Sequence, residues 1–259
     1  LRFSKDLTPV DVLFLCSGHG ESKKFLAANE IPWHTKIIDL STDFRDESEG
    51  FVYGLAEFQK EKIKSATKIA NPGCFATSIE LALLPLAKAG LLKEDVHVSA
   101  ITGSTGAGQS LSSTSHFSWR NNNISIYKAF THQHLAEIKQ TLGTKQAIHF
   151  IPYRGNFSRG IMANVYTSYS GTQEEAEKLY EDFYANSPFV FLSPEAVDVK
   201  QVVNTNKCFL HLQVHEGQIL ISSVIDNLIK GASGQAVQNM NLMLGWQEDA
   251  GLRLKAIGF

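Results

Sequence analysis

The residue best placed to do chemistry is Cys74, in the stretch "ANPGCFATSIELALLPLAK" (70–88). A Pro-Gly pair precedes it and favours a turn. A helical apolar pattern follows, with one face formed by Phe75, Ile79 and Leu83. We therefore expect the sulfur near a helix N-terminus, where free N–H groups and the helix dipole favour an anion and lower a thiol pKa towards neutrality. Cys74 is thus a candidate nucleophile.

The alternative for Cys74 is a small, buried and inert side chain, which is the common fate of cysteine in proteins. Cys16 and Cys208 are interpreted that way, because one ends a strand pattern and the other lies within one. A thiolate nucleophile needs a proton acceptor or donor nearby. The candidates are His132 and His134 in "YKAFTHQHLAEI", where we expect Thr131 to cap a helix that carries His132 in its first turn. A polar first-turn histidine without a catalytic role is the alternative.

A glycine-rich loop, "ITGSTGAGQSLSSTS", is the second feature with chemical potential. Small residues leave its backbone N–H groups open, and Ser104 and Thr105 add hydroxyls, so the loop could wrap an oxyanion or phosphate. It matches neither the Walker loop, which needs Gly-Lys-Ser/Thr, nor the dinucleotide fingerprint, which opens a helix. A flexible surface loop is the alternative.

Composition excludes several classes of function. The chain has 259 residues, of which 43% are hydrophobic, and a formal net charge of −2, so nothing favours nucleic acid or an anionic membrane as a partner. No apolar run approaches the roughly 18 residues that a membrane span needs. Three widely spaced cysteines without a CxxC pair argue against disulfides and zinc and favour a cytoplasmic, reducing compartment. No histidine cluster predicts a metal.

The first third of the chain predicts an α/β unit with a parallel sheet. Short apolar runs at 10–16, 35–41 and 67–70 are typical of buried strands; a turn into a helix within 17–30 and a short helical pattern at 54–66 separate them. Such a sheet places ligands at the carboxyl ends of its strands, which is where Cys74 follows the third run.

The rest of the chain predicts an α+β part with a largely antiparallel sheet. Expected strands lie at 96–103, 147–153, 160–169, 189–192, 207–215 and 218–226, with a hairpin turn in "VHEGQI". Expected helices lie at 132–142, 172–187 and 234–246. We expect one domain of residues 1–95 and 232–259, to which the last helix returns, and a second of residues 96–231.

Six motifs across the chain together resemble the N-acetyl-γ-glutamyl-phosphate reductase family of arginine biosynthesis. They are "KIIDLSTDFR", "NPGCFAT", "ITGSTGAG", "HQHLAEI", "SRGI" and "DNLIKGASGQAVQNMNLM". The resemblance implies a cytoplasmic NADP-dependent oxidoreductase with a Rossmann-like first domain, a substrate-binding and dimerisation domain, and a homodimer or homotetramer. It implies an acyl-phosphate substrate, reduced by NADPH through a cysteine thioester.

The resemblance also implies residue roles. Cys74 matches the family's nucleophile and His132 its acid/base histidine, while Arg159 in "SRGI" would lie by the substrate. The residues expected beside NADP are Ser17, Gly18, Ser104, Gly106 and Asn227.

The sequence departs from the family at its start. Family members open with a strand and a glycine-rich turn that holds the cofactor's pyrophosphate, and "LRFSKDLTPVDVLFLC" has none. We therefore expect a partial cofactor fold, on the order of 60 residues short, that binds NADP poorly. The asparagine-rich "SHFSWRNNNISIYKAF" leaves N-acetyl and N-succinyl substrates both open.

Three other functions remain open at this point. One is an aspartate-semialdehyde dehydrogenase-like reductase, which shares the chemistry. Another is an inactive dimerising remnant without the cofactor fold. The third is a cysteine hydrolase or acyltransferase that works without nicotinamide.

Overall fold

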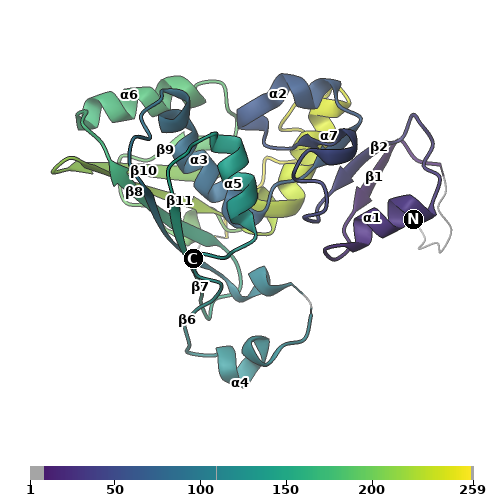
Figure 1. Ribbon diagram of the computed structural model, residues 1–259, viewed down its shortest axis with the longest axis horizontal. Coiled ribbons are helices and arrows are strands. Elements are labelled where there is room, and N and C mark those ends of the chain that lie inside the picture. Colours follow the sequence, from purple (N-terminus) through teal and green to yellow (C-terminus); the bar gives the residue numbers. More distant parts are fainter. Residues whose placement is uncertain (1–8, 109, 258–259) are drawn as a thin grey trace.

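The computed structural model describes residues 9–108 and 110–257, which form two sheets with helices around them (Figure 1). The smaller sheet is parallel and has the strand order β1-β2-β4-β3. Its strands are β1 (Val12–Leu15), β2 (Lys36–Asp39), β3 (Val52–Tyr53) and β4 (Lys68–Ala70). The predicted α/β fold class is confirmed. β3 was not predicted, because two residues are too few for a periodic signal.

Helices cover both faces of the smaller sheet, because successive strand side chains point to opposite sides. On one face Ile37 packs in a cluster with α1 (Glu21–Ala28). On the other, Ile38 packs with α2 (Ala56–Ser65) and with α7 (Gly234–Met243), the last helix of the chain. Residues far apart in sequence therefore share one core.

The larger sheet is mixed, with the strand order β6-β7-β5-β8-β11-β10-β9. Its strands are β5 (Val96–Thr102), β6 (Ser125–Ile126), β7 (Ile148–Arg154), β8 (Ile161–Ser168), β9 (Val190–Leu192), β10 (Cys208–His215) and β11 (Gln218–Ile225). Four of its six pairings are antiparallel, and β5–β7 and β9–β10 are parallel. The β10–β11 hairpin turns at Glu216 and Gly217, both with positive φ, as a tight hairpin requires.

Three helices pack on one face of the larger sheet: α3 (Cys74–Lys88), α5 (His134–Leu142) and α6 (Gln173–Tyr184). α3 is buried on all sides from Phe75 to Leu86 and contains Pro85, which has no N–H for the carbonyl of Leu81. The Tyr184 hydroxyl of α6 donates to that carbonyl at 2.5 Å, and Tyr180 donates to the carbonyl of Ala82. α6 thus satisfies the backbone group that the proline leaves free.

Several short elements complete the fold. α4 (Phe117–Arg120) lies in a loop that projects from the larger sheet in Figure 1. The 3₁₀ turns are η1 (Ser48–Gly50), η2 (Ser104–Ala107), η3 (Ser113–Ser115) and η4 (Val199–Gln201), and η5 (Ile229–Ser233) is a π-helix. No helix in the described part of the chain is long and apolar enough to cross a membrane.

One predicted helix start is wrong. α5 begins at His134, with Gln133 as its N-cap residue and no side-chain cap, so Thr131 does not cap it and His132 precedes the helix. The "HQH" pattern carries no signal that separates these two starts.

Candidate active site

Cys74 is the first residue of α3, and it follows the carboxyl end of β4 by only three residues. The connecting turn is held from both sides. The Asn71 N–H donates to the carbonyl of Asp39 at 2.7 Å, and the Asn71 side chain donates to the carbonyl of Ala232 at 3.1 Å. The structure therefore places the sulfur at a helix N-terminus at the carboxyl edge of a parallel sheet.

Two glycines permit close packing around the thiol. A Cβ at Gly231 would lie 2.7 Å from the Cβ of Cys74, and a Cβ at Gly73 would overlap the ring of His134. The π-helix η5 carries Gly231 to this position, and π-helical turns are frequent at functional sites. At both positions only glycine fits, because any side chain would collide with Cys74 or with His134.

The thiol of Cys74 is half-buried, and burial raises its pKa to about 11. The positive charge of Arg45 and the N–H groups at the start of α3 act in the opposite direction, but they are smaller. The expected pKa near neutrality is therefore wrong. The helix terminus was predicted correctly, whereas the desolvation of the sulfur was not visible in the sequence.

His132 and His134 lie side by side next to the start of α3. Their ring centres are 4.5 Å apart, and the ring of Phe75, the residue after the cysteine, stands edge-on to His132 at 5.6 Å. The N–H of His134 donates to Nδ1 of His132 at 3.2 Å, which leaves Nε2 free for other contacts. The structure thus brings the predicted histidine to the predicted cysteine.

Both imidazoles are electrically neutral near pH 7. Burial lowers the pKa of His132 to about 3, and the charges of His134 and Lys128 add to this effect. Burial also lowers the pKa of His134 well below its ordinary value, aided by Arg45. The site at rest therefore holds a neutral thiol and neutral imidazole rings, instead of a thiolate and an imidazolium.

The carboxylate of Glu137 lies at the centre of a buried polar network behind this site. It accepts hydrogen bonds from Arg45 at 2.8 Å, from the Tyr53 hydroxyl at 2.7 Å and from the Gly73 N–H at 2.9 Å. α5 carries Glu137 three residues after His134, so both point to the turn before Cys74. Because the N–H of Gly73 is one of its donors, Glu137 fixes the backbone next to the nucleophile.

A second carboxyl, that of Glu80, lies on α3 against the same network. Tyr53 Oη lies 3.0 Å from one of its oxygens, and the residue has no exposed surface. Burial raises the pKa of Glu80 well above its ordinary value, and the charge of Glu137 raises it further. Burial therefore favours the protonated form of Glu80, while Glu137 pairs with Arg45.

The glycine-rich loop forms the turn η2 and is anchored by Asn227. The Asn227 amide oxygen accepts from the Gly160 N–H at 2.7 Å, and its Nδ2 donates to the Thr105 hydroxyl at 3.0 Å. The Ser104 N–H donates to the carbonyl of Phe157 at 2.7 Å. A Cβ at Gly106 would lie 2.8 Å from the Thr102 hydroxyl. Asn227 therefore holds the loop, and its contact with a cofactor stays a prediction.

Arg159 lies close to this loop but already has a partner. Its guanidinium forms an ion pair with Asp226 at 2.8 Å, and the side chain is 27% exposed. Asp226 also accepts the N–H groups of Asn204 and Leu228 at 2.7 and 2.8 Å. The role of Arg159 in substrate binding stays a prediction.

Ser17 and Gly18 lie in the exposed loop after β1, which makes its contacts with α1 and the loop after β2. A Cβ at Gly18 would meet no atom within 4 Å, so the backbone there is open to a ligand. The N-terminus of α1 is not open, because Asp43 accepts from the N–H groups of Gly20 and Lys23. The described residues therefore fit the reacting end of a dinucleotide, while the carboxylate of Asp43 lies at the N-terminus of α1, where a phosphate would otherwise be favoured.

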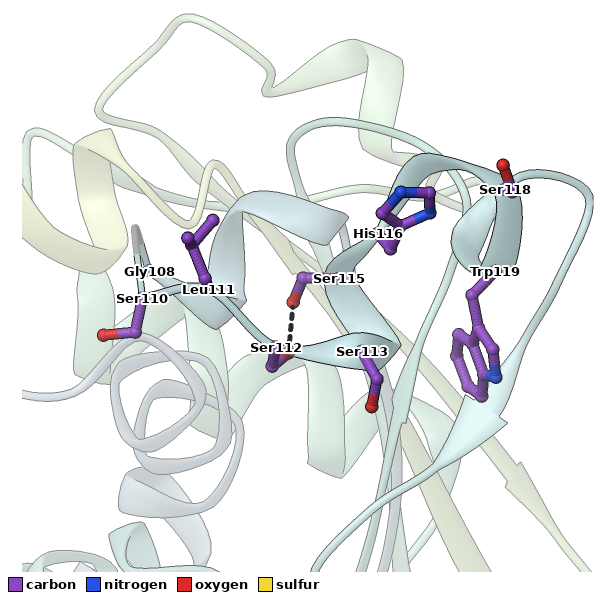
Figure 2. Close-up of a pocket in the computed structure, with 9 residues that line it drawn as sticks. All are labelled: Gly108, Ser110, Leu111, Ser112, Ser113, Ser115, His116, Ser118 and Trp119. Atoms are coloured by element: carbon purple, nitrogen blue, oxygen red, sulfur yellow. Dashed lines mark hydrogen bonds between the residues drawn. The ribbon is translucent and has the colours of Figure 1, made fainter.

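A cavity of about 980 Å³ lies elsewhere, in the projecting loop that holds α4 (Figure 2). Serines, His116 and Trp119 line it, and Ser112 and Ser115 bond to each other at 3.0 Å. None of the predicted catalytic residues borders it. In the described ranges, no group of three or more His, Cys, Asp or Glu residues could hold a metal ion.

Sequence reasoning missed Arg45, Tyr53, Glu80 and Arg154, which surround the site. Arg45 belongs to the quoted motif "KIIDLSTDFR", but nothing in that motif places it against Glu137, 92 positions later. The only available signal was the presence of charged residues among apolar ones, as at Glu80 within α3.

Profiles of known families match most of the chain. Residues 3–66 match the NAD binding domain of semialdehyde dehydrogenases, and residues 74–227 match their dimerisation domain. The structure resembles aspartate semialdehyde dehydrogenase II from Vibrio cholerae, with a TM-score of 0.73, 17% identity, and 91% of this chain and 80% of that chain covered. The two family matches place the chain in the semialdehyde dehydrogenase class, and the structural likeness shows the same fold.

Curated relatives narrow this class. An N-acetyl-γ-glutamyl-phosphate reductase from Christiangramia forsetii is 60% identical, with 98% of this chain and 81% of the relative covered. One from Azobacteroides pseudotrichonymphae is 58% identical, with 99% and 81% covered. The chain belongs to the N-acetyl-γ-glutamyl-phosphate reductase family, and the resemblance drawn from its motifs is confirmed.

The raised pKa of Cys74 predicts how its alkylation depends on pH. Because only the thiolate reacts, the rate of modification by iodoacetamide should rise about tenfold per pH unit from pH 7 to 10 without a plateau. Peptide mapping by mass spectrometry measures this rate at Cys74 separately from the other two cysteines. A plateau reached by pH 8 would contradict a buried neutral thiol.

The protonated state of Glu80 predicts a pH-dependent stability. Above pH 4.5 the unfolded chain loses a proton that the folded chain keeps, so this group lowers the stability as pH rises from 4.5 towards its higher folded pKa. Glu80→Gln removes this term and should raise the Tm more at pH 8 than at pH 5. The surface substitution Glu61→Gln serves as the control. An equal Tm change at both pH values would count against a protonated Glu80.

Proposed function

We propose that the chain reduces an N-acyl-γ-glutamyl phosphate, N-acetyl in the first instance, to the N-acyl-glutamate semialdehyde with NADPH, as a step of arginine biosynthesis. The observation that carries this is Cys74 at the start of α3, beside two neutral histidines and an anchored glycine-rich loop. The family of the curated relatives supports the substrate, since their name specifies that acyl phosphate. The family match at residues 3–66 supports the cofactor.

In the first half-reaction the sulfur of Cys74 forms a bond to the acyl carbon and the carbon–oxygen bond to phosphate breaks. His132, whose Nδ1 accepts the N–H of His134, carries its proton on Nε2; it gives that proton to the leaving phosphate and takes the thiol proton in its place, so the thiol and the imidazole stay neutral until attack. N–H groups at the start of α3 would stabilise the oxyanion, whereas those of Ser104 and Thr105 in the glycine-rich loop already donate to carbonyls. The product is a thioester on Cys74 and inorganic phosphate.

In the second half-reaction NADPH, when bound, supplies a hydride to the thioester carbon. Collapse of the oxyanion then breaks the carbon–sulfur bond, releases the semialdehyde and leaves a thiolate that regains a proton from water through His132. Ser17, Gly18, Ser104, Gly106 and Asn227 are the residues that would hold the nicotinamide end, and Arg159 would contact the substrate. Exclusion of water from the half-buried thioester protects it from hydrolysis.

The dimerisation-domain match over residues 74–227 supports a homo-oligomer, which we propose to be a dimer or tetramer. We propose a first domain of residues 1–95 and 232–259 and a second of residues 96–231, because α7 packs on the smaller sheet. A cytoplasmic location is consistent with three free cysteines in the described structure.

The two half-reactions can be observed separately. Without NADPH, N-acetyl-γ-glutamyl phosphate should add one acyl group to Cys74 and release one phosphate, as measured by intact mass and phosphate assay. NADPH should then remove the adduct and yield semialdehyde. Cys74→Ser should lower adduct formation by at least about a thousandfold, whereas Cys16→Ser should not change it.

Other outcomes of this experiment favour other functions. Loss of the adduct to water at the same rate with and without NADPH would indicate a hydrolase. No adduct with any acyl phosphate, with oligomer formation intact, would indicate an inactive remnant. Faster acylation by aspartyl phosphate than by the glutamyl compounds would favour the aspartate-semialdehyde reaction. The acylation rates with the N-acetyl and N-succinyl glutamyl phosphates decide between those two substrates.

A further inference from the structure

Arg154 lies at the carboxyl edge of the larger sheet, on the same side as the catalytic helix. It ends β7 and is paired in register with Thr102, the last residue of β5 before the glycine-rich loop. Because alternate strand residues share a face, Arg154 is on the same face of β7 as Phe150. The ring centre of Phe150 lies 5.2 Å from that of Phe75 and 5.4 Å from that of His132. The strand therefore directs Arg154 towards the site of Cys74.

The guanidinium of Arg154 is near the reacting residues without blocking them. It stacks on the ring of Tyr127 at 4.3 Å, and Tyr127 lies edge-on to His132 at 5.7 Å between ring centres. Burial raises the pKa of the Tyr127 hydroxyl to about 12, and the charge of Cys74 adds to it while Arg154 opposes it. Arg154 is thus separated from His132 by the width of one aromatic ring, that of Tyr127.

Arg154 has no carboxylate partner within the described structure, and its buried Nε has no hydrogen-bond partner. Arg45 and Arg159, by contrast, are each paired with a carboxylate at 2.8 Å. A second cation, Arg120 of α4, stands beside Arg154 and donates to its carbonyl at 2.6 Å. Burial lowers the pKa of Arg120, and the charge of Arg154 lowers it further.

Two neighbouring guanidinium groups without a counter-ion are unfavourable unless an anion binds between or beside them. Arg120 is buried, and its terminal nitrogens are committed to loop oxygens, so it contributes charge and holds the backbone of Arg154. Arg154 contacts the ring and hydroxyl of Tyr127 but has no carboxylate partner in the described structure, so its fork can bind a planar oxyanion with two parallel hydrogen bonds.

We propose that Arg154 binds the α-carboxylate of the substrate and so selects a glutamyl over an uncharged acyl chain, an inference that rests on the proposed function. The acyl carbon must lie at the sulfur of Cys74, and the α-carboxylate is four carbon–carbon bonds away, a span of roughly 5 Å. The leaving phosphate, by contrast, is attached directly to the acyl carbon. A guanidinium beyond the ring of Tyr127 therefore suits the distant carboxylate better than the phosphate.

The test uses two matched ligands that need no cofactor and no turnover. N-acetylglutamine keeps the α-carboxylate, and N-acetylglutamine α-amide replaces it by a neutral group of the same shape. Calorimetry with the whole chain should show tighter binding of the carboxylate. Arg154→Gln should weaken that binding by roughly 10- to 100-fold, the scale of a lost charge-assisted pair, and leave the amide unchanged.

Two further variants make the result specific. Arg154→Lys keeps the charge without the fork and should show an intermediate preference for the carboxylate. Arg253→Gln removes one exposed positive charge that pairs with Asp249 and should leave the preference as in the native protein. If both Arg154 variants fold and keep the native preference, the proposal is overturned. Weaker binding of inorganic phosphate with an unchanged carboxylate preference would also overturn it, because it would assign Arg154 to the leaving group.

The result is separable from the proposed function. Thioester formation on Cys74 with a carboxylate preference that ignores Arg154 would refute this inference alone. Arg154-dependent binding of the carboxylate without thioester formation would refute the proposed reaction and leave the binding site standing.

Discussion

The buried ion pair between Glu137 and Arg45 is the interaction on which the geometry of the site depends. It joins α5 to the loop after β2, and the same carboxylate holds the N–H of Gly73 immediately before Cys74. Both side chains are almost fully buried, so removal of either partner leaves an unpaired buried charge and lowers the stability strongly. Tyr53 and Glu80 complete the network and tie it to α3. The position of the nucleophile is therefore set by buried residues that other elements of the fold contribute.

This packing explains why the site is neutral at rest. A thiolate at Cys74 would have to be stabilised in a place that is largely closed to water, and burial outweighs the helix terminus and Arg45. The same burial keeps His132 uncharged. Proton transfer then has to accompany attack on the substrate instead of preceding it. The positive charge of Arg154, one aromatic ring away, remains available to recognise an anion.

Much of the fold could be predicted from the sequence, because its signals are local. The strands β1, β2 and β4, the helix that begins at Cys74 and the hairpin at Gly217 follow from apolar periodicity and turn residues. The pairing of Glu137 with Arg45, and that of Arg120 with the end of β7, could not be predicted, because they join residues far apart in the chain. The motif resemblance identified Cys74 and His132, whereas the raised pKa of the thiol depends on tertiary burial that no motif encodes.

The measurement that tests the central claim most directly is a double-mutant cycle on Arg45→Met and Glu137→Gln, read as the free energy of unfolding in urea. Each single change leaves a buried group without its partner and should cost about 3–5 kcal/mol. The double variant should cost less than the sum of the two by at least about 1.5 kcal/mol, because the second change removes the group that the first left unpaired. Costs that simply add would contradict an ion pair that organises the catalytic turn.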